Sequence, residues 1–210
     1  MASLTSMTRE WRRSDSKGYY KITTSRVDIS RDFVNNAFAH PDMHWASPLP
    51  TDEMEIMLEN SLTLGLYTVS ENFPPPSTAS SPSSPRTPSP TLEAPPREHL
   101  QQIGMARMIT DGVTVVYLTD VFLVEEWRGS GLGAWLVECC REVIQSMPKL
   151  RRAVLMATPG PPEDESGGPA VRFYKKMLGM NVMGSGDDIL AMTYKPELSL
   201  IHISEPTRPY

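Results

Sequence analysis

Two kinds of hydrophobic pattern alternate along this chain and predict its elements. Runs rich in β-branched, aromatic and other apolar residues predict seven strands, at residues 19–25, 63–70, 101–111, 113–124, 151–158, 180–185 and 187–195. Apolar residues spaced three and four positions apart predict four helices, at residues 31–39, 51–62, 132–147 and 170–178. The order of these elements predicts a mixed α/β chain of the α+β type.

Residues at the ends of the elements support this assignment. Asp111-Gly112 separates the third and fourth predicted strands and is typical of a tight hairpin turn. Thr51 precedes an acidic first turn, which suits a helix N-terminus. Pro148 ends the third helix, because proline cannot continue the helical hydrogen bonds.

Proline is concentrated in one segment. The chain has 20 prolines against 13 glycines, where average usage gives roughly 10 prolines in this length. Nine of the prolines fall within residues 74–96, together with many serines and threonines. Such a composition does not bury enough apolar surface to offset the entropy of packing. We therefore predict a disordered or polyproline-like insertion between the second and third strands.

The other residues predict a single domain. Residues 1–17 are polar and contain several arginines, which indicates a flexible N-terminal arm. Residues 18–197 carry all the predicted elements and form the domain. Residues 198–210 fit none of its elements and resemble peptide translated from sequencing-adaptor DNA, so we interpret them as a non-domain tail and a sequence artefact.

Charge and cysteine content narrow the functional class. With 25 acidic against 20 basic residues, the net charge of −5 argues against nucleic-acid binding, which needs a concentrated positive field. Apolar runs fall short of the ~18 residues of a membrane span. The cysteines are the neighbours Cys139 and Cys140, which favours a reducing compartment: the cytoplasm, with the nucleus as the alternative. Histidines and cysteines do not cluster, so we expect no metal.

A glycine-rich segment, residues 128–134, joins the fourth strand to the third helix. Its glycines let a ligand approach the backbone, and the N–H groups of the first helical turn favour an anion. A P-loop is excluded because no Gly-Lys-Ser/Thr follows. Gly129, Gly131 and Ala134 satisfy the dinucleotide pattern G-x-G-x-x-A, but the next strand does not end in Asp or Glu. The alternative is that this segment binds no ligand and is only a tight turn before a core helix.

A third phosphate-binding pattern matches this segment in register. Arg128, Gly131 and Gly133 fit R/Q-x-x-G-x-G/A, the pyrophosphate loop of the GCN5-related N-acetyltransferases (GNAT). The helix at residues 170–178, with Phe173-Tyr174 and a glycine behind it, resembles the second signature of that family. The element order is similar too, so the chain resembles the GNAT family over roughly residues 19–195.

The resemblance implies a fold and an activity. The GNAT fold has a central mixed, mostly antiparallel sheet of about seven strands, flanked by about four helices and splayed between the fourth and fifth strands. The implied enzyme is an acyltransferase that moves the acetyl group of acetyl-CoA to a primary amine of a small molecule or protein, by direct attack in a ternary complex. The alternative is a catalytically weak GNAT-fold adaptor, whose proline-rich segment binds a Pro-motif-reading protein partner.

The resemblance also implies site residues. Tyr174 corresponds to a tyrosine that acts as general acid, although Gly179 follows it by five residues instead of the usual four; packing against the sheet is its other interpretation. Asp120 is the candidate general base, with water or a purely hydrogen-bonding role as alternatives. Acetyl-CoA is expected to bind the backbone of Phe122, Leu123, Val124, Arg128, Gly129, Ser130, Gly131, Leu132, Gly133 and Ala134.

Overall fold

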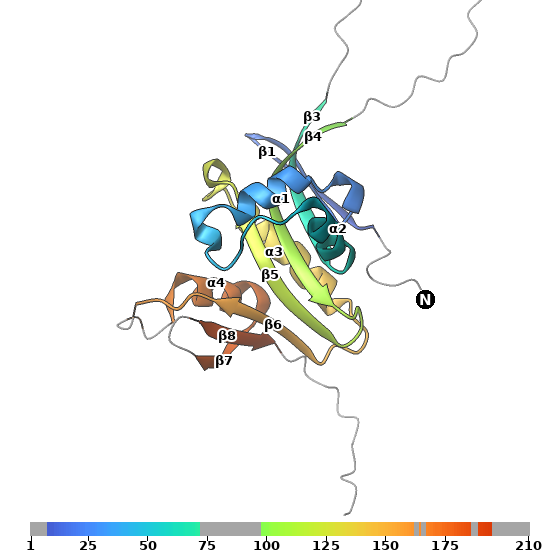
Figure 1. Ribbon diagram of the computed structural model, residues 1–210. Coiled ribbons are helices and arrows are strands. Elements are labelled where there is room, and N and C mark those ends of the chain that lie inside the picture. The colour runs from blue at the N-terminus through green and yellow to red at the C-terminus, as the bar shows by residue number, and fades with distance from the viewer. Residues whose placement is uncertain (1–7, 72–97, 162–163, 165–166, 186–188, 195–210) are drawn as a thin grey trace, which may run out of the picture.

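The computed structural model describes residues 8–71, 98–161, 164, 167–185 and 189–194 (Figure 1). Within them one sheet has the strand order β1-β2-β3-β4-β5-β6-β8-β7. Its strands are β1 Glu10–Asp15, β2 Gly18–Thr23, β3 Leu62–Glu71, β4 Glu98–Thr110, β5 Val115–Leu123, β6 Arg152–Ala157, β7 Asn181–Ser185 and β8 Leu190–Tyr194. Neighbouring strands are antiparallel except β5 and β6, which are parallel. This mixed, mostly antiparallel sheet confirms the predicted fold class.

Four helices of the described residues cover the two faces of the sheet. They are α1 Arg31–Phe38, α2 Thr51–Glu59, α3 Leu132–Gln145 and α4 Gly168–Leu178. In Figure 1, α1 and α2 lie in front of the sheet and α3 lies behind it. Burial agrees: α3 and α4 share one hydrophobic core with the sheet, and α1 and α2 share the other.

Each core is built from side chains that the sequence pattern places on one side of an element. Behind the sheet, Leu136 and Val143 of α3 pack with Leu118 of β5. In front of it, Val34 of α1 packs in the same core as Phe122 of β5. Two residues of one strand, four positions apart, thus face opposite layers, which a regular strand with its period of two does not allow.

The N-terminal strand β1 differs from the prediction. Residues 1–17 are expected to form a flexible arm, and this is wrong for Glu10–Asp15, which pair with β2. Two side chains hold the strand against α3: Trp11 Nε1 donates to Glu142 Oε2 at 2.7 Å, and Arg9 Nη2 donates to Ser146 Oγ at 2.8 Å. These partners are more than 130 residues away, so a local pattern of polar residues does not indicate them.

Other predictions fall on residues that the structure does not describe. The proline-rich insertion at residues 74–96 lies between β3 and β4, outside the described residues, and residues 198–210 lie outside them as well. Both remain predictions. Among the described residues, no helix combines the length and hydrophobicity that a membrane span requires.

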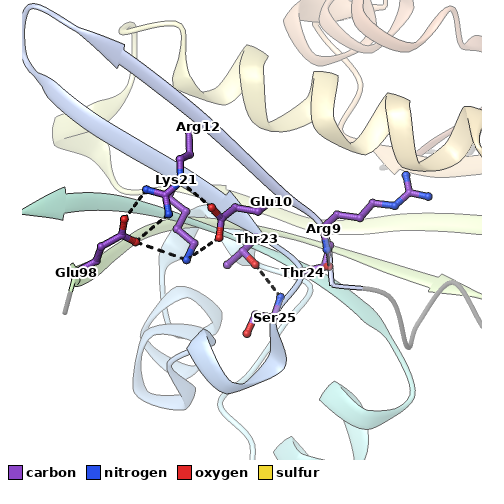
Figure 2. Close-up of polar contacts among 8 residues, drawn as sticks. All are labelled: Arg9, Glu10, Arg12, Lys21, Thr23, Thr24, Ser25 and Glu98. Carbon is purple, nitrogen blue, oxygen red and sulfur yellow. Dashed lines mark hydrogen bonds and ion pairs between the residues drawn. The ribbon is translucent and has the colours of Figure 1, made fainter. Parts of the chain in front are cut away.

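A cluster of four charged side chains joins β1, β2 and β4 (Figure 2). Lys21 Nζ lies 2.9 Å from Glu10 Oε2 and 3.9 Å from Glu98 Oε2. Arg12 binds the same two carboxylates, at 2.7 Å to Glu10 and 2.5 Å to Glu98. Lys21 is nearly buried while its partners are partly exposed, so the cluster holds the edge strand through one sequestered ammonium group.

Replacing Lys21 by methionine tests this cluster. Lys21 is the main cause of the lowered pKa of Glu10, and Arg12 is the main cause for Glu98. We expect Lys21→Met to lower the free energy of unfolding by about 1 kcal/mol at pH 7. A carboxyl with a lowered folded-state pKa stabilises the fold above its ordinary value of 4.5 and ceases to do so as the pH falls, so the difference shrinks by pH 3.5. Urea unfolding at pH 7 and pH 3.5 measures the difference in the free energy of unfolding, and Lys17→Met, at an exposed lysine, is the control. An equal loss for Lys21→Met at the two pH values would contradict the expectation.

Candidate active site

A β-bulge in β5 shapes the centre of the molecule. Met105 of β4 pairs with Phe122, but Arg107 pairs with Thr119, so two residues of β5 lie opposite one residue of β4. Asp120 is one of the two and has a φ of 49°, in the left-handed region that residues other than glycine adopt rarely. The extra residue reverses the side-chain alternation, which is why Leu118 faces α3 and Phe122 faces α1.

The strands next to the bulge separate. β5 and β6 are paired over Val115–Leu118 and Arg152–Leu155, and the pairing stops directly before the bulge. This confirms the splay expected between the fourth and fifth predicted strands, which are β5 and β6. Unpaired backbone of β5 therefore lines a gap that passes from one face of the sheet toward the other.

Two cavities meet at this gap. One has a volume of about 250 Å³ and is lined by Asp120, Tyr174, Trp45 and apolar side chains of β5 and β6. The other, of about 390 Å³, is lined by Leu123, the glycine-rich loop and Phe173. Val121 lines both. The structure thus brings the predicted catalytic pair, Asp120 and Tyr174, into one cavity and the predicted phosphate loop into the adjoining one.

The loop before α3 has the geometry of an anion site. Gly129 and Gly131 have φ values of 73° and 82°, in the left-handed region that favours glycine. Gly131 is the N-cap of α3 and offers no side chain to accept hydrogen bonds from the first helical turn. Those N–H groups are free to bind a ligand, and the helix dipole favours a negative one.

The backbone of β5 offers a different set of groups from the predicted set. Val124 N–H donates to Ile103 of β4 at 2.9 Å, and Phe122 is paired with Met105 of the same strand. Backbone groups of successive residues point to opposite sides of a regular strand, so the N–H of Leu123 is directed away from β4 and toward the gap, while Val121 lies within the bulge and lines both cavities. Of the three predicted residues, Phe122, Leu123 and Val124, the structure places one with its backbone toward the gap.

The side chain of Arg128 has a role in the fold. Its Nε donates to the carbonyl of Leu123 at 2.9 Å, and its Nη1 lies 2.7 Å from Asp42 Oδ2 in the short 3₁₀ helix Pro41–Met43. The guanidinium also lies over the ring of Phe122, at 5.9 Å from the centroid. These contacts join the end of β5 to the segment after α1, and they leave the backbone of Arg128 as its contribution to the loop.

Tyr174 is held by α4 at the border between the core behind the sheet and the cavity that Asp120 and Trp45 line. Desolvation raises its pKa to about 12, and nearby Cys140 adds to this shift. The phenol is therefore protonated throughout the neutral range and is able to donate a hydrogen bond or a proton. Phe173, its neighbour in the sequence, lines the other cavity, so α4 presents one aromatic side chain to each.

The carboxylate of Asp120 is almost fully buried and has three donors. Arg107 Nε lies 2.6 Å from Oδ2, while Thr119 Oγ1 and the indole N–H of Trp45 donate to Oδ1 at 3.0 and 3.3 Å. Sequence reasoning found Asp120 but not Arg107, because the bulge decides which residue of β4 lies beside it. Trp45, whose indole donates to Asp120, lines the same cavity.

The remaining reactive groups are accounted for by packing. Cys139 and Cys140 are buried in α3, and burial raises the pKa of the Cys139 thiol to about 12. Within the described part of the chain, no three His, Cys, Asp or Glu side chains are grouped to hold a metal ion. The polar groups that the described residues bring to the gap are the phenol of Tyr174, the carboxylate of Asp120 and backbone groups of β5.

Comparisons with known proteins identify the family of this chain. A model of the acetyltransferase (GNAT) family matches residues 96–180, which include the bulge, the glycine-rich loop and α4. The Gibberella zeae protein named "Putative acetyltransferase FG08082" is 34% identical over 143 residues, 68% of this chain and 74% of that protein. The chain belongs to the GNAT acetyltransferase family.

Solved GNAT structures have the same fold. The GNAT-family acetyltransferase of Streptococcus pneumoniae matches with a TM-score of 0.50 and 17% identity, covering 89% of this chain and 99% of that one. ACIAD1637 of Acinetobacter baylyi matches with a TM-score of 0.50 and 12% identity, covering 90% and 93%. As a GNAT protein the chain is an acyltransferase enzyme, and acetyl-CoA and an acceptor are the substrates that GNAT acetyltransferases bind.

The buried pair at the bulge of this GNAT enzyme is open to a direct test. Asp120 and Arg107 are 4% and 14% exposed, so removing one partner leaves a charge with little water around it. We expect Asp120→Asn to lower the free energy of unfolding by about 3 kcal/mol and Arg107→Gln by a similar amount. The double variant should lose clearly less than the sum, because neither charge is then left alone. Urea unfolding of the four proteins measures the coupling; additive losses would show that the pair does not stabilise the fold.

Proposed function

We propose that this enzyme transfers the acetyl group of acetyl-CoA to a primary amine by direct attack in a ternary complex. The observation that carries the proposal is the meeting of two different cavities at Val121 in the β5–β6 gap. One cavity has the anion-binding loop that a coenzyme needs, and the other has a protonated phenol and an apolar wall. A thioester that extends through the gap presents its carbonyl carbon to the second cavity.

On the donor side, backbone groups supply the recognition. The N–H groups of the first turn of α3 and the loop that begins at Gly129 suit the pyrophosphate. The pantetheine arm has amides like those of a peptide. The unpaired backbone at Val121 and the N–H of Leu123 suit these amides as a missing strand would, while the carbonyl of Leu123 already accepts from Arg128. A backbone N–H at this place also stabilises the oxyanion that forms on the thioester carbonyl.

The chemical step needs few protein groups. The neutral amine attacks the thioester carbonyl carbon, a C–N bond forms, and the C–S bond breaks as the tetrahedral intermediate collapses. The phenol of Tyr174 gives its proton to the departing thiolate, and the amine loses its extra proton to water, which returns a proton to the phenolate of Tyr174. Asp120 is already held by Arg107, Thr119 and Trp45, so we assign it a positioning role at the bulge and leave the role of base to water.

The acceptor cavity indicates the class of amine. Trp45, Met156 and Ile189 line it with about half of their surfaces exposed, so the cavity offers an apolar wall to a ligand. Among its described residues the carboxylate is that of Asp120, and it is already paired. Its volume of about 250 Å³ suits a small molecule. We therefore propose a small primary amine with an aromatic or branched apolar body, in preference to a polyamine or a basic peptide.

An acceptor screen tests this function. We expect CoA to stabilise the protein, by about 2.7 kcal/mol at 100 times its Kd, and NAD at the same concentration to have no effect. With acetyl-CoA, release of free thiol should be faster with 2-phenylethylamine than with spermidine or a lysine peptide. Stabilisation by CoA with a preference for spermidine would overturn the acceptor class alone. No stabilisation by CoA and no thiol release with any amine would overturn the proposed function.

Tyr174→Phe tests the general acid. Losing the phenol proton should lower kcat at least tenfold with little change in the KM for acetyl-CoA, because the phenol acts only as the thiolate leaves. As the pKa of Tyr174 is raised to about 12, deprotonation of this group should not reduce the wild-type rate up to pH 10. Steady-state rates from pH 7 to 10 measure both. Tyr194→Phe removes the same atom from β8, outside both cavities, and serves as control; equal kcat in the Tyr174 and Tyr194 variants would exclude the role.

A further inference from the structure

Arg13 lies where β1 meets the glycine-rich loop. Alternate residues from Arg9, which precedes β1, along the strand face α3: Arg9 contacts Ser146, Trp11 contacts Glu142, and Arg13 is the next in this series. The strand therefore follows α3 from its C-terminal end toward its N-terminus. Arg12 faces the other way, toward the charged cluster, as Figure 2 shows, and Arg9 points away from that cluster.

The guanidinium of Arg13 reaches the N-cap of α3. A Cβ placed on Gly131 would be 3.8 Å from Nη2 and 3.9 Å from Nη1 of Arg13. The ion pairs found among the described residues do not include Arg13, whereas neighbouring Arg12 has two. A half-buried cation without a carboxylate partner in the described structure thus lies beside the N–H groups of the first turn of α3.

Arg13 lies opposite a buried tyrosine in the sheet. Tyr20 lies directly opposite Arg13 in the β1–β2 register and is buried. The ring of Tyr20 packs edge-on against Trp127, at 5.8 Å between centroids, and Trp127 begins the turn that leads into the loop. Cross-strand neighbours on one face of a sheet lie close together, so the position of Arg13 is set by the fold.

We propose that Arg13 binds a phosphate group of the coenzyme at the glycine-rich loop. The inference rests on the proposed function, since it takes the loop as the site of acetyl-CoA. The loop supplies neutral N–H donors, and Arg13 supplies the positive charge that they lack. An arginine is suited to this task because its planar guanidinium donates two parallel hydrogen bonds to phosphate oxygens.

Kinetics with acetyl donors that differ in their phosphates test the proposal. We expect Arg13→Gln to raise the KM for acetyl-CoA about tenfold and to leave kcat and the KM for the amine unchanged. With acetyl-pantetheine, which has no phosphate at the loop, the variant and the wild type should be equal. Acetyl-dephospho-CoA separates the two sources of phosphate: a tenfold effect that persists identifies the pyrophosphate, and one that disappears identifies the 3′-phosphate.

Controls separate binding from folding. Arg9→Gln removes the same charge from the same face of β1, at the other end of α3, and should not change the KM for acetyl-CoA. Arg13→Lys should recover part of the affinity, since it restores the charge without the two-pronged geometry. An unchanged KM in Arg13→Gln, or an equal loss with acetyl-pantetheine, overturns the assignment. If the wild type itself does not use acetyl-CoA, the proposed function fails instead.

Discussion

The ion pair between Asp120 and Arg107 stabilises the irregularity on which the site depends. Asp120 adopts a left-handed backbone conformation in the middle of β5, which has a cost for any residue with a side chain. Three donors to its carboxylate compensate that cost. Without the extra residue, β5 would keep its alternation and continue to pair with β6, and the gap that joins the two cavities would close. The carboxylate of Asp120 thus stabilises the bulge at which the pairing of β5 and β6 stops.

The donor half of the site combines segments from distant parts of the chain. The loop before α3 contributes backbone N–H groups, the gap contributes the free edge of β5, and β1 brings Arg13 to the same place. Each is fixed by packing: α3 by its core, β5 by the bulge, and β1 by Trp11 on Glu142. The edge strand β1 matters because it brings the positive charge of Arg13 to the loop. The loop itself offers glycines in the left-handed region, and the side chain of its own arginine, Arg128, is paired with Asp42.

Local patterns predicted most of the elements and several site residues. Helical spacing located α3, a hairpin dipeptide located the β4–β5 turn, and the glycine motif located the loop, because each depends on neighbours in the sequence. Arg107 and the gap-facing backbone of Val121 could not be found this way, because both follow from a register shift between two strands. β1 was missed for a related reason: the side chains of Trp11 and Arg9, which hold it against α3, bind residues more than 130 positions away.

Desolvation links the two sides of the proposed reaction. Burial favours the neutral form of any titratable group, so it keeps Tyr174 protonated and the Cys139 thiol inert. The same physics acts on an amine that enters an apolar cavity: its pKa falls, and the neutral, nucleophilic form becomes more populated. A site of this kind does not need a free carboxylate to remove a proton before attack. The apolar wall around Trp45 therefore fits the proposed mechanism, because it favours the neutral amine, and the pairing of Asp120 with Arg107 fits it as well, because a free carboxylate is not needed.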